Sequence, residues 1–424
     1  MDDRQGKAAV DGGEQKSQIT RAANKINHNY IVTERKFDMS REYKGKVMTI
    51  FGPKDPKELG PTLPHEHLYF NTSGYKPEMT PEQERLYLSP VTLQNLNYVR
   101  KNPYRVLDNC LMFDQDLLRR AVQEFKDFGG GTICDVTPHG CSLDSPLVDF
   151  LPEIKEVAED TGVNVVLGMG HYIHAFDIPE ESKAAASASG KNYDILVSPT
   201  SPAIEGFTPE RLAEEYIKDI KNGYGDTGIR PGVIGELGTG FVVTDLEKRT
   251  LRAGAIAQQE TGLAITLHLQ PSRMHGHEDL DILEEAGARL DKVVLGHRDG
   301  VLAIPGMSFD EVMDNYYSLL DRGCYIQFDL CGNQEYFRSD LGNWWLPADR
   351  ERAQAIKLIC DHGYEDKILI SQDEGHKYYM TEFGGWGLAH VLNGFRETML
   401  EYGVTEAQCD KIVTENPQTM LTIF

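Results

Sequence analysis

The sequence predicts one (β/α)₈ barrel, a fold also called a TIM barrel. Three observations lead to this prediction. Short apolar runs rich in β-branched residues occur eight times, amphipathic segments separate them, and glycine follows most of those segments. Alternating strands and helices form a parallel sheet that is buried on both faces. Eight such units favour closure into a barrel over the alternative, an open doubly wound sheet.

The apolar runs are the predicted strands. Each is short and lies between glycine-containing joins, which is typical of a buried strand. In chain order they are Gly60–His67, Gly131–Thr137, Asn164–Gly170, Gly232–Gly238, Leu263–Leu269, Lys292–His297, Tyr325–Leu330 and Lys367–Asp373.

The segments between the runs have helical periodicity and helix-end signals. In residues 114–130, apolar side chains recur at helical spacing at Leu117, Leu118, Ala121, Val122 and Phe125. Thr244 with Glu247, and Ser308 with Glu311, fit the capping box that opens a helix. A glycine that can adopt a left-handed cap follows six of the helical stretches, at Gly130, Gly162, Gly262, Gly287, Gly323 and Gly363.

Two segments depart from the repeat. Residues 1–45 are polar with little periodicity, and we expect a disordered tail before a single barrel domain of residues 46–424. Residues 176–208 form an unusually long connection after the third strand. Loops on that side of a barrel line the active site, so this insertion is expected to act as a lid or a specificity loop.

Composition restricts the classes of partner. The chain has 424 residues and a formal net charge of −23, which argues against a nucleic-acid surface. An anionic substrate would need local cationic groups, because the overall field repels it. No apolar run reaches the length of a membrane span, and the first residues do not resemble a signal peptide. The seven cysteines form no CxxC pair, and we expect reduced thiols in a cytoplasmic protein.

Catalytic residues of such barrels gather at the carboxyl ends of the strands. The first predicted strand ends in His65-Glu66-His67. Side chains alternate along a strand, so the two histidines face the same way and Glu66 faces elsewhere. An HxH pair alone is weak evidence for a metal site.

Four further strand ends carry metal-ligand side chains: Glu236, His268, His297 and Asp373. Each has an ordinary explanation, since a buried histidine can bond to backbone and an aspartate can cap a helix. Together with His65 and His67, they supply four imidazoles and two carboxylates at the same end of the barrel. This donor set, which lacks thiolate, favours a catalytic site for zinc, manganese or cobalt.

The positions of these residues, an HxH on the first strand, a carboxylate on the fourth, histidines on the fifth and sixth and an aspartate on the eighth, match the pattern of a known family. The stretches LGPTLPHEHL, LNYVRKNPY, GVIGELG, GCYIQFDLCG, GYEDKIL and ENPQ resemble the phosphotriesterase-like branch of the amidohydrolase superfamily, and the resemblance covers about residues 45–424. Within this branch the sequence is most similar to the animal phosphotriesterase-related subgroup, which is associated with hydrolysis of N-acetyltaurine.

The resemblance implies a binuclear site with two divalent ions, zinc first, with Mn²⁺, Co²⁺ or Fe²⁺ as alternatives. It places His65, His67 and Asp373 on one ion, His268 and His297 on the other, and Glu236 between them, where many members have a carboxylated lysine. In the implied mechanism, the ions activate a shared water and Asp373 transfers its proton to the leaving amine. Tyr172 would lean toward this water, or be an aromatic residue of the rim.

An N-acetyltaurine-like substrate carries a sulfonate, for which Arg298 and Lys377 are the predicted contacts, followed by His376 and Arg273. The alternative functions are a lactonase or esterase and, more remotely, a non-catalytic metal-binding protein. The sequence departs from the family in residues 176–208, in Glu374–Lys377 and in Pro138–Ser142, which lacks a common arginine. These departures leave the substrate open. Relatives also suggest a homodimer.

Overall fold

The computed structural model describes residues 39–72, 79–138, 147–173, 204–334, 337–338 and 344–424. Most of the predicted tail and most of the 176–208 connection lie outside these residues. The short helix α2 (Met39–Glu42), with buried Met39, lies inside the segment that we assigned to the tail.

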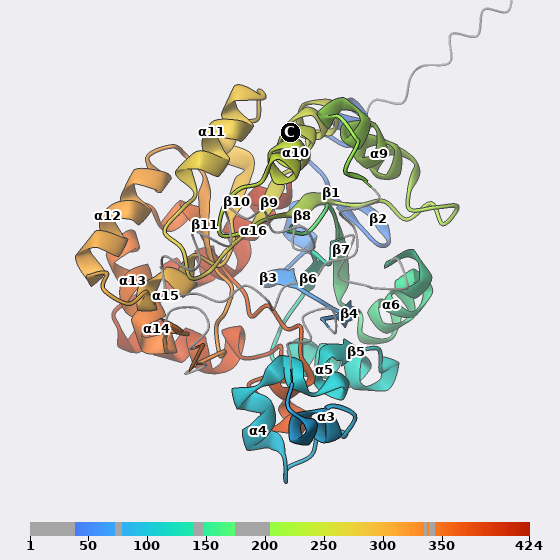
Figure 1. Ribbon diagram of the computed structural model, residues 1–424. Coiled ribbons are helices and arrows are strands. Elements are labelled where there is room, and N and C mark those ends of the chain that lie inside the picture. The colour runs from blue at the N-terminus through green and yellow to red at the C-terminus, as the bar shows by residue number, and fades with distance from the viewer. Residues whose placement is uncertain (1–38, 73–78, 139–146, 174–203, 335–336, 339–343) are drawn as a thin grey trace, which may run out of the picture. The chain divides into compact units, whose positions relative to one another are not determined.

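Eight parallel strands form the centre of the fold, and helices surround them (Figure 1). Each predicted apolar run coincides with one of these strands, although β8 continues one residue past its run, so the (β/α)₈ prediction is confirmed. The strands are β3 (Thr62–Glu66), β6 (Thr132–Asp135), β7 (Asn164–Met169), β8 (Val233–Thr239), β9 (Ile265–Leu269), β10 (Val293–Leu295), β11 (Tyr325–Phe328) and β14 (Ile368–Ile370). Their order in the sheet follows the chain, with β3 and β14 at its two ends.

The larger helices alternate with these strands. They are α5 (Gln115–Asp127), α6 (Leu147–Thr161), α9 (Pro209–Asn222), α10 (Asp245–Thr261), α11 (His277–Glu285), α12 (Phe309–Leu320) and α13 (Asp349–Asp361). In α5 the five predicted apolar residues are the buried ones, and α10 and α12 begin with the two predicted capping boxes. None of the helices in the described residues has the length and apolarity needed to cross a membrane.

Five of the six predicted cap glycines have a positive φ, but Gly130 does not. Helix α5 ends at Asp127, and Gly129, rather than Gly130, takes the left-handed position with φ 90°. Gly130 is required for another reason. A Cβ at this position would lie 2.4 Å from the Phe125 ring.

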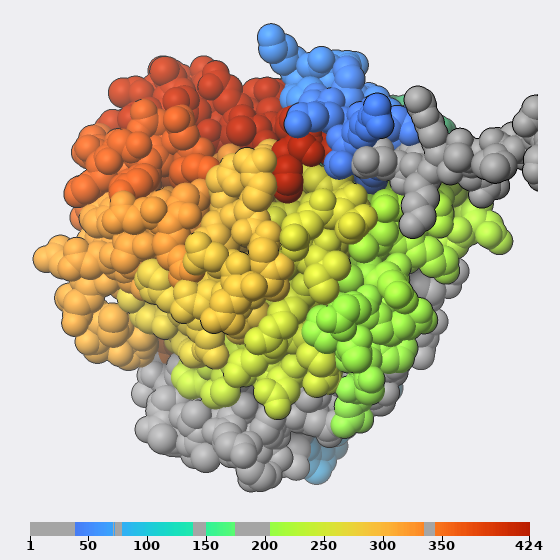
Figure 2. Space-filling view, turned by 90° about the horizontal axis from the view of Figure 1, so that it is seen from above, coloured from blue at the N-terminus to red at the C-terminus, as the bar shows by residue number. Residues whose placement is uncertain are grey.

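Smaller elements extend the barrel. The hairpin of β1 (Val47–Thr49) and β2 (Gly52–Lys54) lies beside the C-terminal segment, where Gly45 N donates to Ile423 O (Figure 2). Additions after the strands include β4 (Phe70–Asn71) paired with β5 (Leu111–Met112), β12 (Phe337–Arg338) paired with β13 (Trp344–Trp345), and helices α3 (Pro81–Tyr87) and α4 (Leu96–Lys101). The chain ends in α14 (Arg396–Glu401), α15 (Glu406–Asp410) and α16 (Asn416–Leu421).

An apolar cluster fills the barrel near the start of its strands. Val166, Val233 and Val294 belong to it, as do Val47 of the hairpin and Leu421 of α16. Burial of each such side chain contributes about 1.5–3 kcal/mol. This end of the barrel is therefore a packed core, and the polar side chains lie at the other end.

Side chains, rather than a strand ladder, hold β3 against β14. The carboxylate of Glu66 accepts hydrogen bonds from Ser371 Oγ at 2.6 Å and from the backbone N–H groups of Gln372 and Glu374, both at 2.9 Å. Asp373 N donates to His65 O at 3.3 Å. We call this junction the Glu66 seam. It confirms that Glu66 faces away from the two neighbouring histidines.

Candidate metal centre

Glu236 lies at the middle of the polar end of the barrel. It is on β8, at a point where the pairing register with β9 shifts between Ile234 and Leu237. Such irregularities change the direction of a side chain and are frequent beside active sites. Close approach of β7 requires Gly170, where a Cβ would lie 2.5 Å from Glu236 O.

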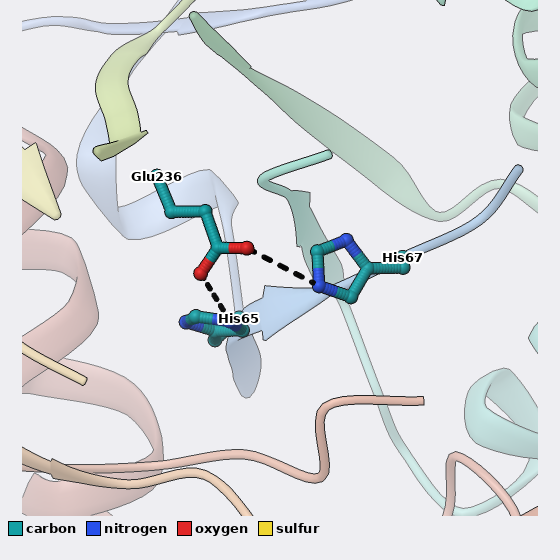
Figure 3. Close-up of side chains that lie close together, drawn as sticks. All are labelled: His65, His67 and Glu236. Carbon is teal, nitrogen blue, oxygen red and sulfur yellow. Dashed lines mark ion pairs between the residues drawn. The ribbon is translucent and has the colours of Figure 1, made fainter. Parts of the chain in front are cut away.

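The two oxygens of Glu236 face different histidines. Oε2 lies 3.2 Å from His65 Nε2, and Oε1 lies 3.7 Å from His67 Nε2 (Figure 3). On its other side, Oε2 lies 3.5 Å from His268 Nδ1 and 3.8 Å from His297 Nε2. The carboxylate therefore stands between two pairs of imidazoles, as a bridging ligand would.

Asp373 lies beside the first pair of imidazoles, His65 and His67. Its Oδ1 lies 3.1 Å from His67 Nε2 and 3.9 Å from His65 Nε2. All six side chains predicted as metal ligands thus meet at one place. Asp373 and His297 are also the non-glycine residues with positive φ in the described chain, at 53° and 55°. Such strain is often found at functional sites.

Neighbouring groups fix the rings so that one nitrogen of each faces the centre. His297 Nδ1 lies 2.8 Å from Asp329 Oδ1, and His65 Nδ1 lies 2.9 Å from the Gln327 amide. His67 Nδ1 lies 3.0 Å from Thr137 Oγ1. Partners of this kind set the tautomer and orientation of metal-binding histidines.

Several of the inward-facing atoms need a cation. His65 Nε2 and Glu236 Oε2 are buried without a hydrogen-bond partner within the described residues. His268 Nδ1 and His297 Nε2 approach to 2.7 Å, a contact that requires either a proton or a shared positive ion. Three groups of residues have donor atoms close enough to hold an ion, and two of them, His65–His67–Glu236 and Glu236–His268–His297, share Glu236; the third is His65–His297–Asp329. The residues therefore fit two divalent cations that share Glu236.

The local field also favours positive charge. Burial alone lowers the pKa of His65, but Asp329 and Glu236 outweigh burial and raise this pKa to about 10. Burial likewise lowers the pKa of His297, which Asp329 raises to about 9. A field that stabilises protons on these rings also stabilises a cation between them.

The remaining predicted site residues differ in their positions. Tyr172 lies at the centre, with its hydroxyl 3.4 Å from His268 Nε2. Lys377 pairs with Asp108 at 2.6 Å and is 15% exposed. Arg298 is fully buried and donates to Arg273 O at 3.1 Å. His376 is buried beside Thr72. Tyr172 therefore lies next to the six predicted metal ligands. Substrate contact by Arg298 or Lys377 stays a prediction.

Sequence reasoning missed or undervalued three residues that orient the histidines of the site. Gln327 lies on β11, and Asp329 directly follows this strand. The Gln327 amide donates to the Asp329 carboxylate, and alternation along the chain could have placed both beside the histidines. Thr137 follows β6 and carried no signal beyond its position at a strand end.

Comparison with known proteins agrees with this geometry. A model of the phosphotriesterase family matches residues 45–421. The chain belongs to this family. N-acetyltaurine hydrolase of Danio rerio is 32% identical over 385 residues, which are 90% of this chain and 99% of that protein. Phosphotriesterase-related protein of Nematostella vectensis is 32% identical over 89% of this chain and 99% of its own length.

Solved structures of phosphotriesterase-like proteins have the same fold. A resiniferatoxin-binding protein from Rhodobacter sphaeroides aligns with a TM-score of 0.76 and 30% identity, covering 89% of this chain and 95% of that one. The lactonase Lmo2620 from Listeria monocytogenes aligns with a TM-score of 0.64 at 24% identity, which supports the fold alone. Family membership and the donor cluster together indicate a metal-dependent hydrolase.

Proposed function

We propose that this chain hydrolyses the amide of N-acetyltaurine or a related N-acyl amino acid, at a binuclear centre of His65, His67, Glu236, His268, His297 and Asp373. The complete donor set around Glu236 carries the proposal. It occurs in a chain whose relatives, 32% identical over nearly their whole length, are named N-acetyltaurine hydrolase. Divalent ions bound there, zinc first, would polarise the scissile carbonyl and acidify the attacking water.

Asp373 is the proposed proton carrier. Burial alone would raise its pKa, but the bond to His67 and the charge of His297 hold the pKa well below its usual range. Asp373 is therefore ionised at neutral pH and can accept a proton from the attacking water. It then returns the proton to the leaving nitrogen. Tyr172, beside His268, is placed to orient the water or the carbonyl oxygen.

The sulfonate or carboxylate of the substrate requires a cation. Lys377 is the better of the two predicted contacts because its ammonium keeps some exposure, whereas Arg298 has none. Binding through Lys377 would compete with its ion pair to Asp108. The homodimer and the cytoplasmic location stay predictions of the sequence.

The test is hydrolysis of N-acetyltaurine, N-acetyl amino acids and lactones by the metal-loaded full chain. We expect amide cleavage that a chelator abolishes and that Asp373→Asn lowers by about 10²–10⁴-fold in kcat. Asp366→Asn, at an exposed aspartate paired with Lys411, is the matched control and should retain activity. Turnover of lactones alone would reject the amide substrate and favour the lactonase alternative.

A further inference from the structure

A second cavity lies behind the chain segment that carries Asp373. Its volume is about 740 Å³, within the range of small-molecule sites. Helix α4, the turn after β11, β13 and residues 372–386 contribute to its walls. None of the six proposed metal donors lines it. Asp373 faces His67 inside the barrel, whereas its neighbours Gln372 and Glu374 line this cavity.

A buried carboxyl group lines the cavity and lacks a full set of partners. Glu374 is 2% exposed, and its Oε2 has no hydrogen-bond partner within the described chain. Its Oε1 has only a long contact, 3.4 Å, with Gln372 Nε2. An unsatisfied buried carboxyl oxygen is costly. A ligand N–H group, above all an ammonium, would supply the missing donor.

Two indole rings provide an apolar wall. Trp345 and Trp386 line the cavity, yet they are 48% and 56% exposed, which is unusual for such large apolar side chains. Trp386 packs on His390, with ring centroids 4.6 Å apart. Rings held in this way can pack against an apolar ligand body, and indole also attracts a nearby ammonium.

The third feature is a pair of cations on α4. Arg100 and Lys101 are exposed and line the same cavity, in a chain with a net charge of −23. Arg100 donates one bond to Gly384 O, which fixes its guanidinium beside the cavity wall. The two side chains offer a carboxylate or another anionic group a local positive field.

We propose that this cavity is a second small-molecule site, which binds a zwitterionic amino acid with an apolar or aromatic side chain. The ammonium of the ligand meets Glu374, its carboxylate meets Arg100 and Lys101, and its side chain packs against Trp345 and Trp386. This site is separate from the hydrolytic centre, and binding to it does not depend on the proposed reaction.

Calorimetric titration of the full chain tests the site with three related probes. L-phenylalanine has all three groups, 3-phenylpropionate lacks the amine, and phenethylamine lacks the carboxylate. We expect saturable binding of L-phenylalanine, weakened at least about tenfold by loss of either group. No binding of L-phenylalanine at millimolar concentration would overturn the proposal, as would equal affinity for 3-phenylpropionate.

Variants locate the binding. Glu374→Gln keeps the shape of the side chain and should weaken L-phenylalanine binding at least about tenfold. Lys101→Gln should weaken the same binding by about threefold. Lys218→Gln, at an exposed lysine of α9, is the matched control for the lost charge and should bind as the unmodified chain does. Should Glu374→Gln fail to fold, the exposed substitutions Lys101→Gln and Trp386→Leu decide the question. Unchanged affinity in both would overturn the site.

Tryptophan emission provides an independent readout. Two of the three tryptophans of the chain line the cavity, and the third, Trp344, is buried with its indole bonded to Gly300 O. L-phenylalanine does not absorb at the excitation wavelength of tryptophan. We expect it to shift the emission and to protect it from acrylamide. An unshifted, equally quenched spectrum at saturation would place the ligand elsewhere and overturn the assignment.

Discussion

The candidate metal centre and a second buried cluster of histidine and carboxylate differ in what balances their charge. In the candidate metal centre, Glu236 and Asp373 face imidazoles, and two inward atoms have no hydrogen-bond partner among the described residues. The second cluster contains its own cation, Arg352. Its Nε donates to Asp299 at 2.7 Å and its Nη1 to Asp349 at 2.8 Å.

The second cluster, which we call the Arg352 network, also includes His390, whose Nε2 lies 2.6 Å from Asp349 Oδ2. Asp299 and Asp349 accept the backbone N–H groups of Leu330 and Gly332, so the network fixes the turn after β11. The comparison shows that residue type alone does not identify a metal site. A buried carboxylate paired with arginine is structural, whereas one surrounded by imidazoles leaves room for an ion.

The largest expected effect comes from removing the internal cation. Arg352→Met leaves Asp299 and Asp349 buried without their partner. The free energy of unfolding, measured by urea denaturation, should therefore fall by about 3–5 kcal/mol. Arg350→Met, at an exposed arginine of the same helix, is the control. A loss below about 1 kcal/mol would show that the network does not need its arginine.

Removal of metal should have the next largest effect, because the proposed metal centre, unlike the Arg352 network, needs an external cation. At a free metal concentration of ten times Kd, each of the two proposed ions adds about 1.4 kcal/mol to folded stability, or about 3 kcal/mol together. Chelation should therefore lower Tm in the unmodified chain and in Arg352→Met by similar amounts. An unchanged Tm after complete chelation would contradict the proposed cation site.

Asp329 and Asp299 provide a sharper comparison, since both are buried aspartates beside neighbouring strands. Asp329→Asn removes the group that orients His297, and metal affinity should fall by about 10–100-fold. Asp299→Asn should reduce stability and leave metal affinity unchanged. Competition with a chromogenic chelator measures the metal affinity of both variants. Equal affinities would show that the two clusters do not differ in metal binding.

The smallest expected effect depends on pH. Burial raises the pKa of Asp349, but His390 and Arg352 outweigh burial and lower it below the usual value. A lowered folded pKa stabilises the protein above the unfolded pKa, about 4. That stability is lost as pH falls through the folded value. His390→Gln should cost about 1.5 kcal/mol at pH 7 and progressively less below pH 4. An equal cost at every pH would exclude the carboxylate as the cause.

Much of this arrangement follows from local patterns in the sequence. Apolar runs at regular intervals predicted the eight strands, and the side chains at their ends predicted Glu236 and the five residues that meet around it. Both depend on a position within one strand and on the rule that parallel strands end on the same side.

Contacts between residues far apart in the chain could not be predicted in this way. The burial of Arg298, the partners of Lys377, the Glu66 seam and the Arg352 network depend on packing, for which periodicity carries no information. The left-handed backbone of His297 and Asp373 was also unexpected, because side chains of this kind rarely adopt it and only the surrounding contacts hold it.

The Glu66 seam has a consequence for how the protein is made. The ribosome synthesises His65 and His67 early, but Asp373 and the donors that bind Glu66 emerge about three hundred residues later. A nascent chain that stops before residue 373 can form most of the parallel sheet and still lack Asp373, the proposed ligand beside His65 and His67. An ion beside His65, His67 and Asp373 is therefore expected only after the last strand has joined the first, whereas Glu236, His268 and His297 are already present before that step.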